Sequence, residues 1–308
     1  MDYKKIEELV NLANKENLRI SDIVLKDQSA VLEESEEICF ERMAENLNVM
    51  LEAIEKGTNP NTKSTSGLTG GDAYKIYERA ENGNALCGPL LANGIRMALA
   101  VSELNASMGK ITAAPTAGSC GILPGAIGAV MKVKDADKKN AVMSLFTAGA
   151  IGMVIANTAS ISGAEGGCQA ECGSASAMAA AAIVELCGGT PEMVMHASAI
   201  ALKCILGLVC DPVAGLVEIP CIKRNASGVS LAFTAAELAL AGIKSKIPAD
   251  EVILTMKKIG DSMPAALRET AEGGLASTPT GKKLQNTVFG TKHEETKFTG
   301  CASCRACR

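Results

Sequence analysis

Apolar residues recur at helical spacing along almost the whole chain, in runs separated by glycine and proline. Near the N-terminus, Ile6, Leu9, Val10 and Ala13 mark one apolar face, as the 3.6-residue period of an amphipathic helix requires. No segment alternates apolar and polar residues in the manner of a half-buried strand. The pattern therefore predicts an all-α fold, a compact multi-helix domain whose helices are broken by loops rich in glycine and proline.

Start and stop signals divide this pattern into helices. Ser21 and Asp22 resemble an N-cap for one long helix that ends at Gly57. Turn-forming residues predict a long loop over 58–72. Further helices are expected over residues 86–108, 138–157, 175–186, 190–207, 226–241 and 249–259. Residues 1–300 are predicted to form a single all-helical domain, with N-terminal helices in 1–57, and residues 301–308 a cysteine-rich mobile tail.

Composition limits how these helices pack and where the protein works. The chain has no Trp and only five Phe, so small Ala and Gly side chains predict closely spaced helices. A net charge of −4 without a basic stripe argues against nucleic-acid binding. The N-terminus mixes acids and bases, unlike a secretory signal. A cytoplasmic protein is expected, in which the 12 cysteines are ligands, reactive groups or core residues and not a disulfide framework.

One segment is long enough to span a membrane. Residues 140–164 carry no charge, and about 20 apolar residues suffice for a spanning helix. Its apolarity is weakened by glycines and by Asn140, Thr147, Asn157, Thr158, Ser160 and Ser162. We expect a buried helix followed by a loop, and no membrane contact.

Three cysteines stand in the breaks between helical segments. Cys168 lies in GAEGGCQAE, and Cys210 and Cys221 lie in GLVCDPVAGLVEIPC. Loop thiolates with small neighbours suit a metal ion or an iron–sulfur cluster. A [4Fe–4S] cluster normally takes four thiolates, so three would leave one iron open as a Lewis acid. The alternative is that each cysteine is a small core residue.

Several further motifs follow one another along the chain. They are STSGLTGGDAYK, NASMGKITAAPTAGSCGILPG, SISGAEGGCQAECGSASAMAAAA, ALKCILGLVCDPVAGLVEIPCIKRNA and ETAEGGLASTPTGKKL. With these motifs the chain resembles, over most of its length, the α chain of the iron–sulfur-dependent L-serine dehydratases. The resemblance implies that Cys168, Cys210 and Cys221, in the GCQ, CDP and PC motifs, bind a [4Fe–4S] cluster.

The same resemblance implies a lyase that converts L-serine to pyruvate and ammonia, in amino-acid degradation and gluconeogenesis. Hydroxide must leave from Cβ, and a base must remove the weakly acidic α-proton. An iron that binds the serine hydroxyl and carboxylate would stabilise both developing charges. Aminoacrylate then tautomerises and hydrolyses, so no pyridoxal phosphate is needed.

The chain offers few candidates for the general base that this reaction needs. It has two histidines, and His196, on the helix before Cys210, is the candidate catalytic residue. A histidine on an apolar helix is more often a core residue. The SSSHT-type loop of the family is absent here. In the family it belongs to a β chain or to the N-terminal half of fused forms, so the resemblance implies a heterodimer with a β chain that completes the site.

Two loops are candidates for binding the substrate L-serine. Thr116 and Ser119 in APTAGSCG offer hydroxyls and backbone N–H groups for a carboxylate. Thr65, Ser66 and Gly67 offer the same in TSGLTGG. The alternative is that both stretches are simply turns between helices.

Other acids and cysteines near these motifs are assigned secondary roles. Glu165 and Glu171, which flank Cys168, are candidates for pairing with the substrate ammonium or for ordinary helix-terminal acids. Cys120 and Cys172 are interpreted as supporting or packing residues. Small core positions are predicted for Cys39, Cys87, Cys187 and Cys204.

The C-terminal end carries a separate cysteine motif. Cys301, Cys304 and Cys307 form C-x2-C-x2-C, which begins like a ferredoxin cluster motif but lacks its fourth cysteine and following proline. Three readings stay open: a zinc or second-cluster site with His293, an unstructured end, or a resting fourth ligand to the open iron that serine displaces.

Alternative functions also stay open. A dehydratase for another small β-hydroxy acid or amino acid, such as threonine, would keep the cluster, because one methyl group changes binding by only about 1–3 kcal/mol. A non-catalytic redox or metal-handling scaffold would need a fully ligated cluster. A pyridoxal-phosphate enzyme is disfavoured, since no strand is predicted to present its lysine.

Overall fold

A computed structural model of the chain describes residues 3–290, and within that range it contains thirteen α-helices and no β-strand. The helices are α1 (Ile6–Glu16), α2 (Ile20–Leu32), α3 (Glu36–Gly57), α4 (Asp72–Glu81), α5 (Pro89–Ala106), α6 (Ile122–Lys134), α7 (Lys138–Thr158), α8 (Gly163–Gly166), α9 (Ser174–Leu186), α10 (Pro191–Lys203), α11 (Cys221–Leu240), α12 (Ala249–Ser262) and α13 (Pro279–Phe289). Short helical turns are η1 (Ala117–Ser119), η2 (Gln169–Gly173), η3 (Val213–Gly215), η4 (Ala265–Leu267) and η5 (Gly274–Ser277). The all-α prediction is confirmed.

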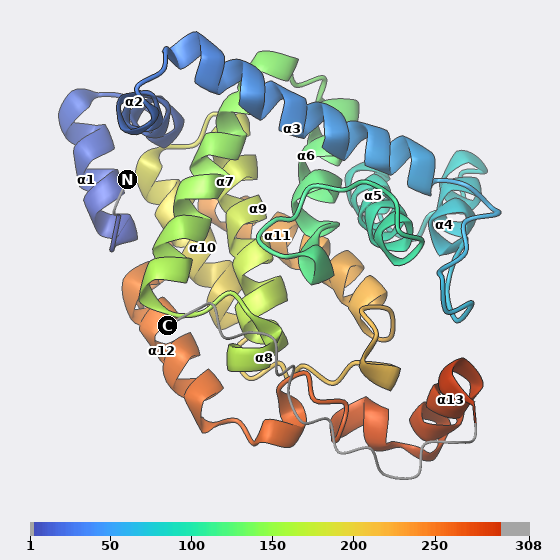
Figure 1. Ribbon diagram of the computed structural model, residues 1–308. Helices are drawn as coiled ribbons and strands as arrows, with labels where there is room; N and C mark the ends of the chain where they lie inside the picture. The colour runs from blue at the N-terminus through green and yellow to red at the C-terminus, as the bar shows by residue number, and fades with distance from the viewer. Residues whose placement is uncertain (1–2, 291–308) are drawn as a thin grey trace.

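Helix α9 lies at the centre of the fold. It packs against α6, α7, α10 and α11 (Figure 1), and every residue from Ser174 to Glu185 is buried. Its sequence, SASAMAAAAIVEL, supplies mostly methyl-sized side chains, so four neighbouring helices can approach one axis closely. The closely spaced helices expected from the composition are therefore present.

Glycine provides the same close approach between α5 and its neighbours. A methyl group added to Gly125 of α6 would lie 2.9 Å from the backbone nitrogen of Ala98 in α5, and one added to Gly57 would lie 2.0 Å from the carbonyl oxygen of Ala100. Helix α3, which runs across α5 and α6 (Figure 1), is thereby held directly against the α5 backbone. These contacts place the end of α3, and the loop that follows it, beside α5.

Helix α7 contains most of the uncharged segment that is long enough to span a membrane. By length and composition it could cross a bilayer, but 72% of its most apolar window is buried inside the fold. It packs against α9, α2 and α3. A core helix is expected to have this burial, which agrees with the buried helix predicted from the sequence.

The helix boundaries differ from the prediction near the N-terminus. The single helix expected up to Gly57 is two helices, because Glu33 takes a left-handed conformation (φ 54°) after α2 and the Ser35 hydroxyl caps α3 by accepting from Ile38 N. Ser21 is not a cap either, since it is buried one residue inside α2. Ser35, a possible N-cap in the middle of the expected helix, was the sequence signal for this break.

Four helices were not predicted at all: α4, α6, α8 and α13. In α6 the motif ILPGAIG suggested a break, but Pro124 occupies the first turn, where its missing N–H has no intrahelical partner to lose. The glycines that follow face α5 and other packed neighbours. Close packing has therefore overridden the low helix propensity of this segment.

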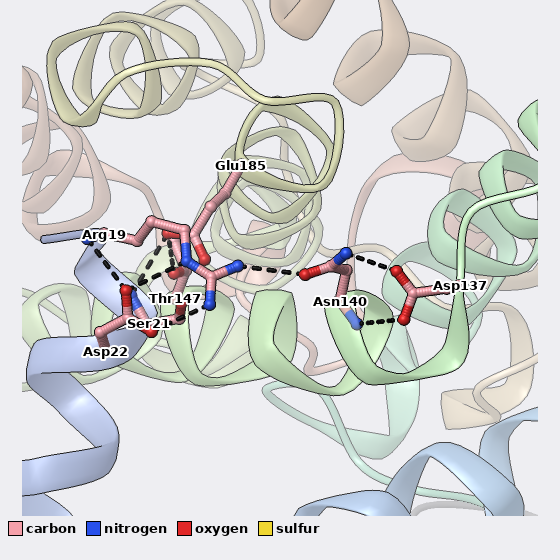
Figure 2. Close-up of polar contacts among 7 residues, drawn as sticks. All are labelled: Arg19, Ser21, Asp22, Asp137, Asn140, Thr147 and Glu185. Carbon is pink, nitrogen blue, oxygen red and sulfur yellow. Dashed lines mark hydrogen bonds and ion pairs between the residues drawn. The ribbon is translucent and has the colours of Figure 1, made fainter.

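A buried carboxyl group joins the N-terminal helices to the core. Glu185 Oε2 of α9 accepts from the Thr147 hydroxyl of α7 at 2.6 Å and from Ser21 N of α2 at 3.3 Å (Figure 2). Beside it, Arg19 pairs with Asp22 and donates to Asn140. Burial is the main reason that the pKa of Glu185 is raised. The carboxyl group therefore costs the fold stability when it ionises.

This shift predicts how stability depends on pH. Because the folded-state pKa of Glu185 lies above its unfolded value, its contribution is fully present at low pH and is lost as pH rises through the folded pKa. Glutamine cannot ionise, so the melting temperature of E185Q minus that of the wild type should become more positive between about pH 4 and pH 8. E237Q, at an exposed position of α11, is the control. Parallel curves for E185Q and the wild type would contradict the prediction.

Candidate functional site

The fold brings the three loop cysteines to one place. Cys168 precedes the π-helical turn η2, Cys210 lies after α10, and Cys221 is the first residue of α11. All three are buried and free of disulfides. Burial and then the charge of Cys168 raise the pKa of Cys221 to about 12, and the pKa of Cys210 is raised by burial and by both other thiols. The three sulfur atoms thus lie within electrostatic range of one another, and we call this group the thiol site.

The thiol site is not a ready-made pocket for one ion. Among residues 3–290, no group of three or more His, Cys, Asp or Glu residues is close enough to hold a single metal ion. A four-iron cluster makes a different demand, because each thiolate binds a different iron and the thiolates need not converge. A buried set of three free thiols, without a nitrogen ligand among them, fits that softer and larger group.

A glycine of α8, Gly163, packs closely against the thiol site. A methyl group added to Gly163 of α8 would lie 2.9 Å from Cys210 Sγ and 3.1 Å from Glu269 Oε2. Both contacts are tighter than ordinary van der Waals packing. The missing side chain therefore lets α8 approach Cys210 and Glu269 closely.

One guanidinium group balances charge at the thiol site. Arg224 of α11 pairs with Asp211 (Nη2 to Oδ1, 2.8 Å) and donates to the carbonyl of Val209 (2.9 Å). Asp211 in turn accepts from Leu275 N at 2.8 Å. The pKa of Cys168 is lowered mainly by its hydrogen bond with Cys172 and further by Arg224. Arg224 thus favours thiolate at Cys168 while it holds the Cys210 loop in place.

Cys172 is closer to Cys168 than the sequence suggested. The two sulfur atoms are 3.3 Å apart, and Cys172 is fully buried at the base of α9. The burial of Cys172, Cys120 and Cys39 agrees with the packing positions predicted for them, and the supporting role of Cys172 stays a prediction. The core prediction is wrong for Cys187 and Cys204, which are exposed because each lies at the C-terminal cap of a helix, and Cys87 is only half-buried.

The loop that contains Thr116 and Ser119 reaches the thiol site through a carboxyl group. The Thr116 hydroxyl donates to Glu171 Oε1 and lies 3.2 Å from the Ser119 hydroxyl. Burial, reinforced by the charge of Glu269, raises the pKa of Glu171, and Glu171 acts on the pKa of all three thiols. Glu165 does not share this place, since it accepts from Ser160 at 2.6 Å within its own loop.

The loop with Thr65, Ser66 and Gly67 docks against the loop that carries Cys221. Ser66 and Thr69 donate to the buried Glu218 Oε2 at 3.0 and 2.7 Å, three residues before Cys221. Gly67 makes the turn with φ 77°. Thr65 instead bonds through N–H and hydroxyl to the carbonyl of Ala106, so it faces the end of α5.

A cleft of about 830 Å³ opens beside this docked loop. It is lined by residues 60–63 and 67–70 and by Asp72, Lys75, Ile219, Pro220 and Lys223. The two lysines pair with Asp72 across it. The cleft therefore follows the backbone that leads into Cys221, with positive charge on its rim.

His196 lies apart from these groups. It is partly exposed on α10, and burial and then Lys244 lower its pKa, while Glu192 raises it. None of these charged neighbours is among the main causes of the pKa shifts of the three thiols. A catalytic role for His196 stays a prediction. The possible resting ligands Cys301, Cys304 and Cys307, and also His293, lie outside the described residues.

Sequence analysis missed Glu269, Arg224 and Glu218 as members of the site. All three stand in motifs that carry the family resemblance, but nothing in their spacing tells which side chains reach the thiols. Glu269 is placed by backbone pairing, because Cys210 N donates to Leu267 O at 2.9 Å and Glu269 N donates to Cys210 O at 2.8 Å. Only the folded chain brings residues 210 and 269 together.

Comparison with known proteins now adds to this geometry. The family model described as "Serine dehydratase alpha chain" matches residues 15–276. The chain is 53% identical to the probable L-serine dehydratase alpha chain of Bacillus subtilis, over 94% of this chain and 96% of that protein. It is 45% identical to the L-serine dehydratase alpha chain of Peptoniphilus asaccharolyticus, over 90% and 95%. An L-serine dehydratase of Streptomyces coelicolor is 41% identical over 89% of this chain and 60% of that longer protein.

Proposed function

The chain belongs to the serine dehydratase alpha chain family, and from this premise we propose that it is the catalytic chain of an enzyme that converts L-serine to pyruvate and ammonia. The observation that carries the proposal is the thiol site. Three separate loops deliver three buried free thiols to one place, and the matched range of the family includes all of them. Burial at such a site excludes water from the reacting groups.

Cys168, Cys210 and Cys221 would hold a [4Fe–4S] cluster in this proposal. When bound, the cluster would supply an open iron as a Lewis acid toward the hydroxyl that leaves. Support comes from the soft donor set and from Arg224, which offsets thiolate charge. A fully thiol-ligated electron carrier would have no use for the polar loops that surround this site.

The chain's own residues prepare the site for a small polar substrate. Glu171 fixes the Thr116 hydroxyl beside that of Ser119, and Glu218 fixes Ser66 and Thr69. A hydroxyl group that donates to a carboxylate can still accept from a ligand through its lone pairs, as Thr116 can, whereas Ser66 already accepts from Leu68 N at 3.1 Å. We propose that Thr116, Ser119 and the turn at Thr65, Ser66 and Gly67 position the substrate. Thr65 would do so indirectly, because its hydrogen bonds to the Ala106 carbonyl fix this turn at the end of α5.

A β chain is the partner that the proposal requires. Two of the relatives are named alpha chains, and about two-fifths of the Streptomyces coelicolor dehydratase lies outside the part that the chain matches. The isolated chain has His196 as its only described histidine, away from the thiols. We propose that a β chain completes the site in a cytoplasmic heterodimer and supplies the missing base.

The test uses the chain produced together with its β chain and handled without oxygen. Iron and sulfide are measured, followed by electron paramagnetic resonance of the reduced protein with and without L-serine, and by pyruvate formation. A cluster signal that shifts with L-serine, together with pyruvate release, supports the proposal. An unshifted signal without pyruvate would indicate an electron-carrying or structural cluster, and protein without iron would leave the three cysteines as core residues. L-Threonine serves as the comparison substrate.

A further inference from the structure

Glu269 stands at the edge of the thiol site but has no part in the proposal so far. Its Oε2 atom and Cys210 Sγ flank the same point, because a methyl group on Gly163 would lie 3.1 and 2.9 Å from them. Its charge raises the pKa of Cys210, Cys221 and Glu171. A carboxylate therefore lies next to a thiol that is proposed to hold the cluster.

The backbone of Glu269 is held in an uncommon conformation. Its φ is 63°, a left-handed value that a residue with a Cβ adopts only at an energetic cost. The chain that leads into Glu269 is tied to Cys210, by the bonds Cys210 N to Leu267 O and Glu269 N to Cys210 O. The carboxylate thus has a fixed origin beside the thiol site, although the side chain itself is exposed to solvent.

This carboxylate has no protein partner among residues 3–290. No hydrogen bond or ion pair to its oxygens is found there, whereas Glu171 accepts from Thr116 and Glu218 accepts from Ser66 and Thr69. The nearby cation Arg224 is already paired with Asp211. The edge of the site therefore presents a negative charge that is exposed, positioned and unmatched, and a cationic ligand group would complete it.

We propose that Glu269 binds the α-ammonium group of the substrate. This inference rests on the proposed function, since L-serine is a zwitterion whose ammonium lies one carbon from the hydroxyl-bearing Cβ. With the ammonium on Glu269 at the exposed edge, the hydroxyl points inward toward the buried thiols. Through this contact Glu269 favours the binding of amino acids over that of hydroxy acids, which lack the amino group.

The experiment compares two ligands in variants of the assembled two-chain protein. L-Serine carries the ammonium group, and 3-hydroxypropanoate is the same molecule without it. Binding of each is measured from the shift of the cluster signal and, for 3-hydroxypropanoate, from inhibition of pyruvate formation. In E269Q we expect L-serine to bind about ten- to a hundredfold more weakly, the usual value of a charged hydrogen bond, and 3-hydroxypropanoate to bind as in the wild type.

Three further measurements keep the result interpretable. E269D, which keeps the charge on a shorter side chain, should recover part of the affinity for L-serine. E272Q, three residues along at an exposed position, should bind both ligands normally. Iron content should be equal in all variants, because the proposed role is toward substrate and not toward the cluster.

Several outcomes would overturn the inference. They are an equal loss of affinity for both ligands, a fall in iron content in E269Q, and unchanged L-serine binding in E269Q. If instead the wild-type protein holds iron and makes no pyruvate from L-serine, the proposed function itself fails. The wild-type assay thus separates the two failures.

Discussion

Replacing Cys210 with alanine should remove iron from the protein and lower pyruvate formation by more than about a hundredfold, since even outer partners of metal ligands cost 10- to 100-fold. Cys210 is buried, free and within electrostatic range of both other thiols of the site. Its backbone is tied to Leu267 and Glu269, so the loop has support that does not depend on the sulfur atom. C168A and C221A should give the same result. Iron per chain and the cluster absorption are the measurements.

The matched control is Cys172→Ala. Cys172 is as buried as the proposed ligands, and its sulfur is 3.3 Å from that of Cys168, yet it is assigned a supporting role. C172A should retain iron with at most a modest loss of activity. If C172A loses iron while C210A keeps it, the ligand assignment from the GCQ, CDP and PC motifs is incorrect.

Replacing Gly57 with alanine should be among the most destabilising single-methyl changes in the chain. The added methyl group would lie 2.0 Å from the Ala100 carbonyl oxygen and 2.5 Å from its carbon, atoms of a rigid helix backbone. Overpacking of this kind costs about 1–3 kcal/mol and occasionally more. At roughly 2–4 °C per kcal/mol the melting temperature should fall by several degrees. Thermal unfolding followed by circular dichroism measures it.

Gly149 is also a helical glycine, but an added methyl group would meet no neighbouring atom. It lies inside α7, is exposed, and has nothing within 4 Å of an added methyl group. Because alanine is the better helix former by about 1 kcal/mol, G149A should be neutral or stabilising. Equal melting temperatures for G57A and G149A would show that the α3–α5 approach is not as close as described.

Hydrophobic periodicity and cap residues were sufficient for much of the fold. Thr190, Pro191 and Glu192 predicted the start of α10, where the Thr190 hydroxyl accepts from Met193 N. Local signals failed where packing outweighed them. Gly125 in α6 reads as a helix breaker until α5 is placed against it, and the exposure of Cys187 and Cys204 depends on which helix ends face solvent.

Some residues of the candidate site could be predicted from local sequence patterns, and others could not. The motifs around Cys168, Cys210 and Cys221 singled out the three thiols because loop cysteines beside glycine and proline are a local pattern. Glu269, Arg224 and Glu218 could not be singled out, because their roles come from contacts across long stretches of chain: residue 269 beside 210 and residue 218 beside 66.

By itself, the sequence determined the helical class and the buried character of α7, and it singled out the three thiols as candidates, since each depends on residue types at short spacing. Tertiary structure alone decided which polar side chains surround those thiols. Gly163 allows α8 to approach Cys210, Arg224 supplies the positive charge, and the backbone at residues 267–269 brings a carboxylate to the edge. The physical reason is range: capping and amphipathicity act over one or two helical turns, whereas a site is assembled by packing between elements that the chain order does not place together.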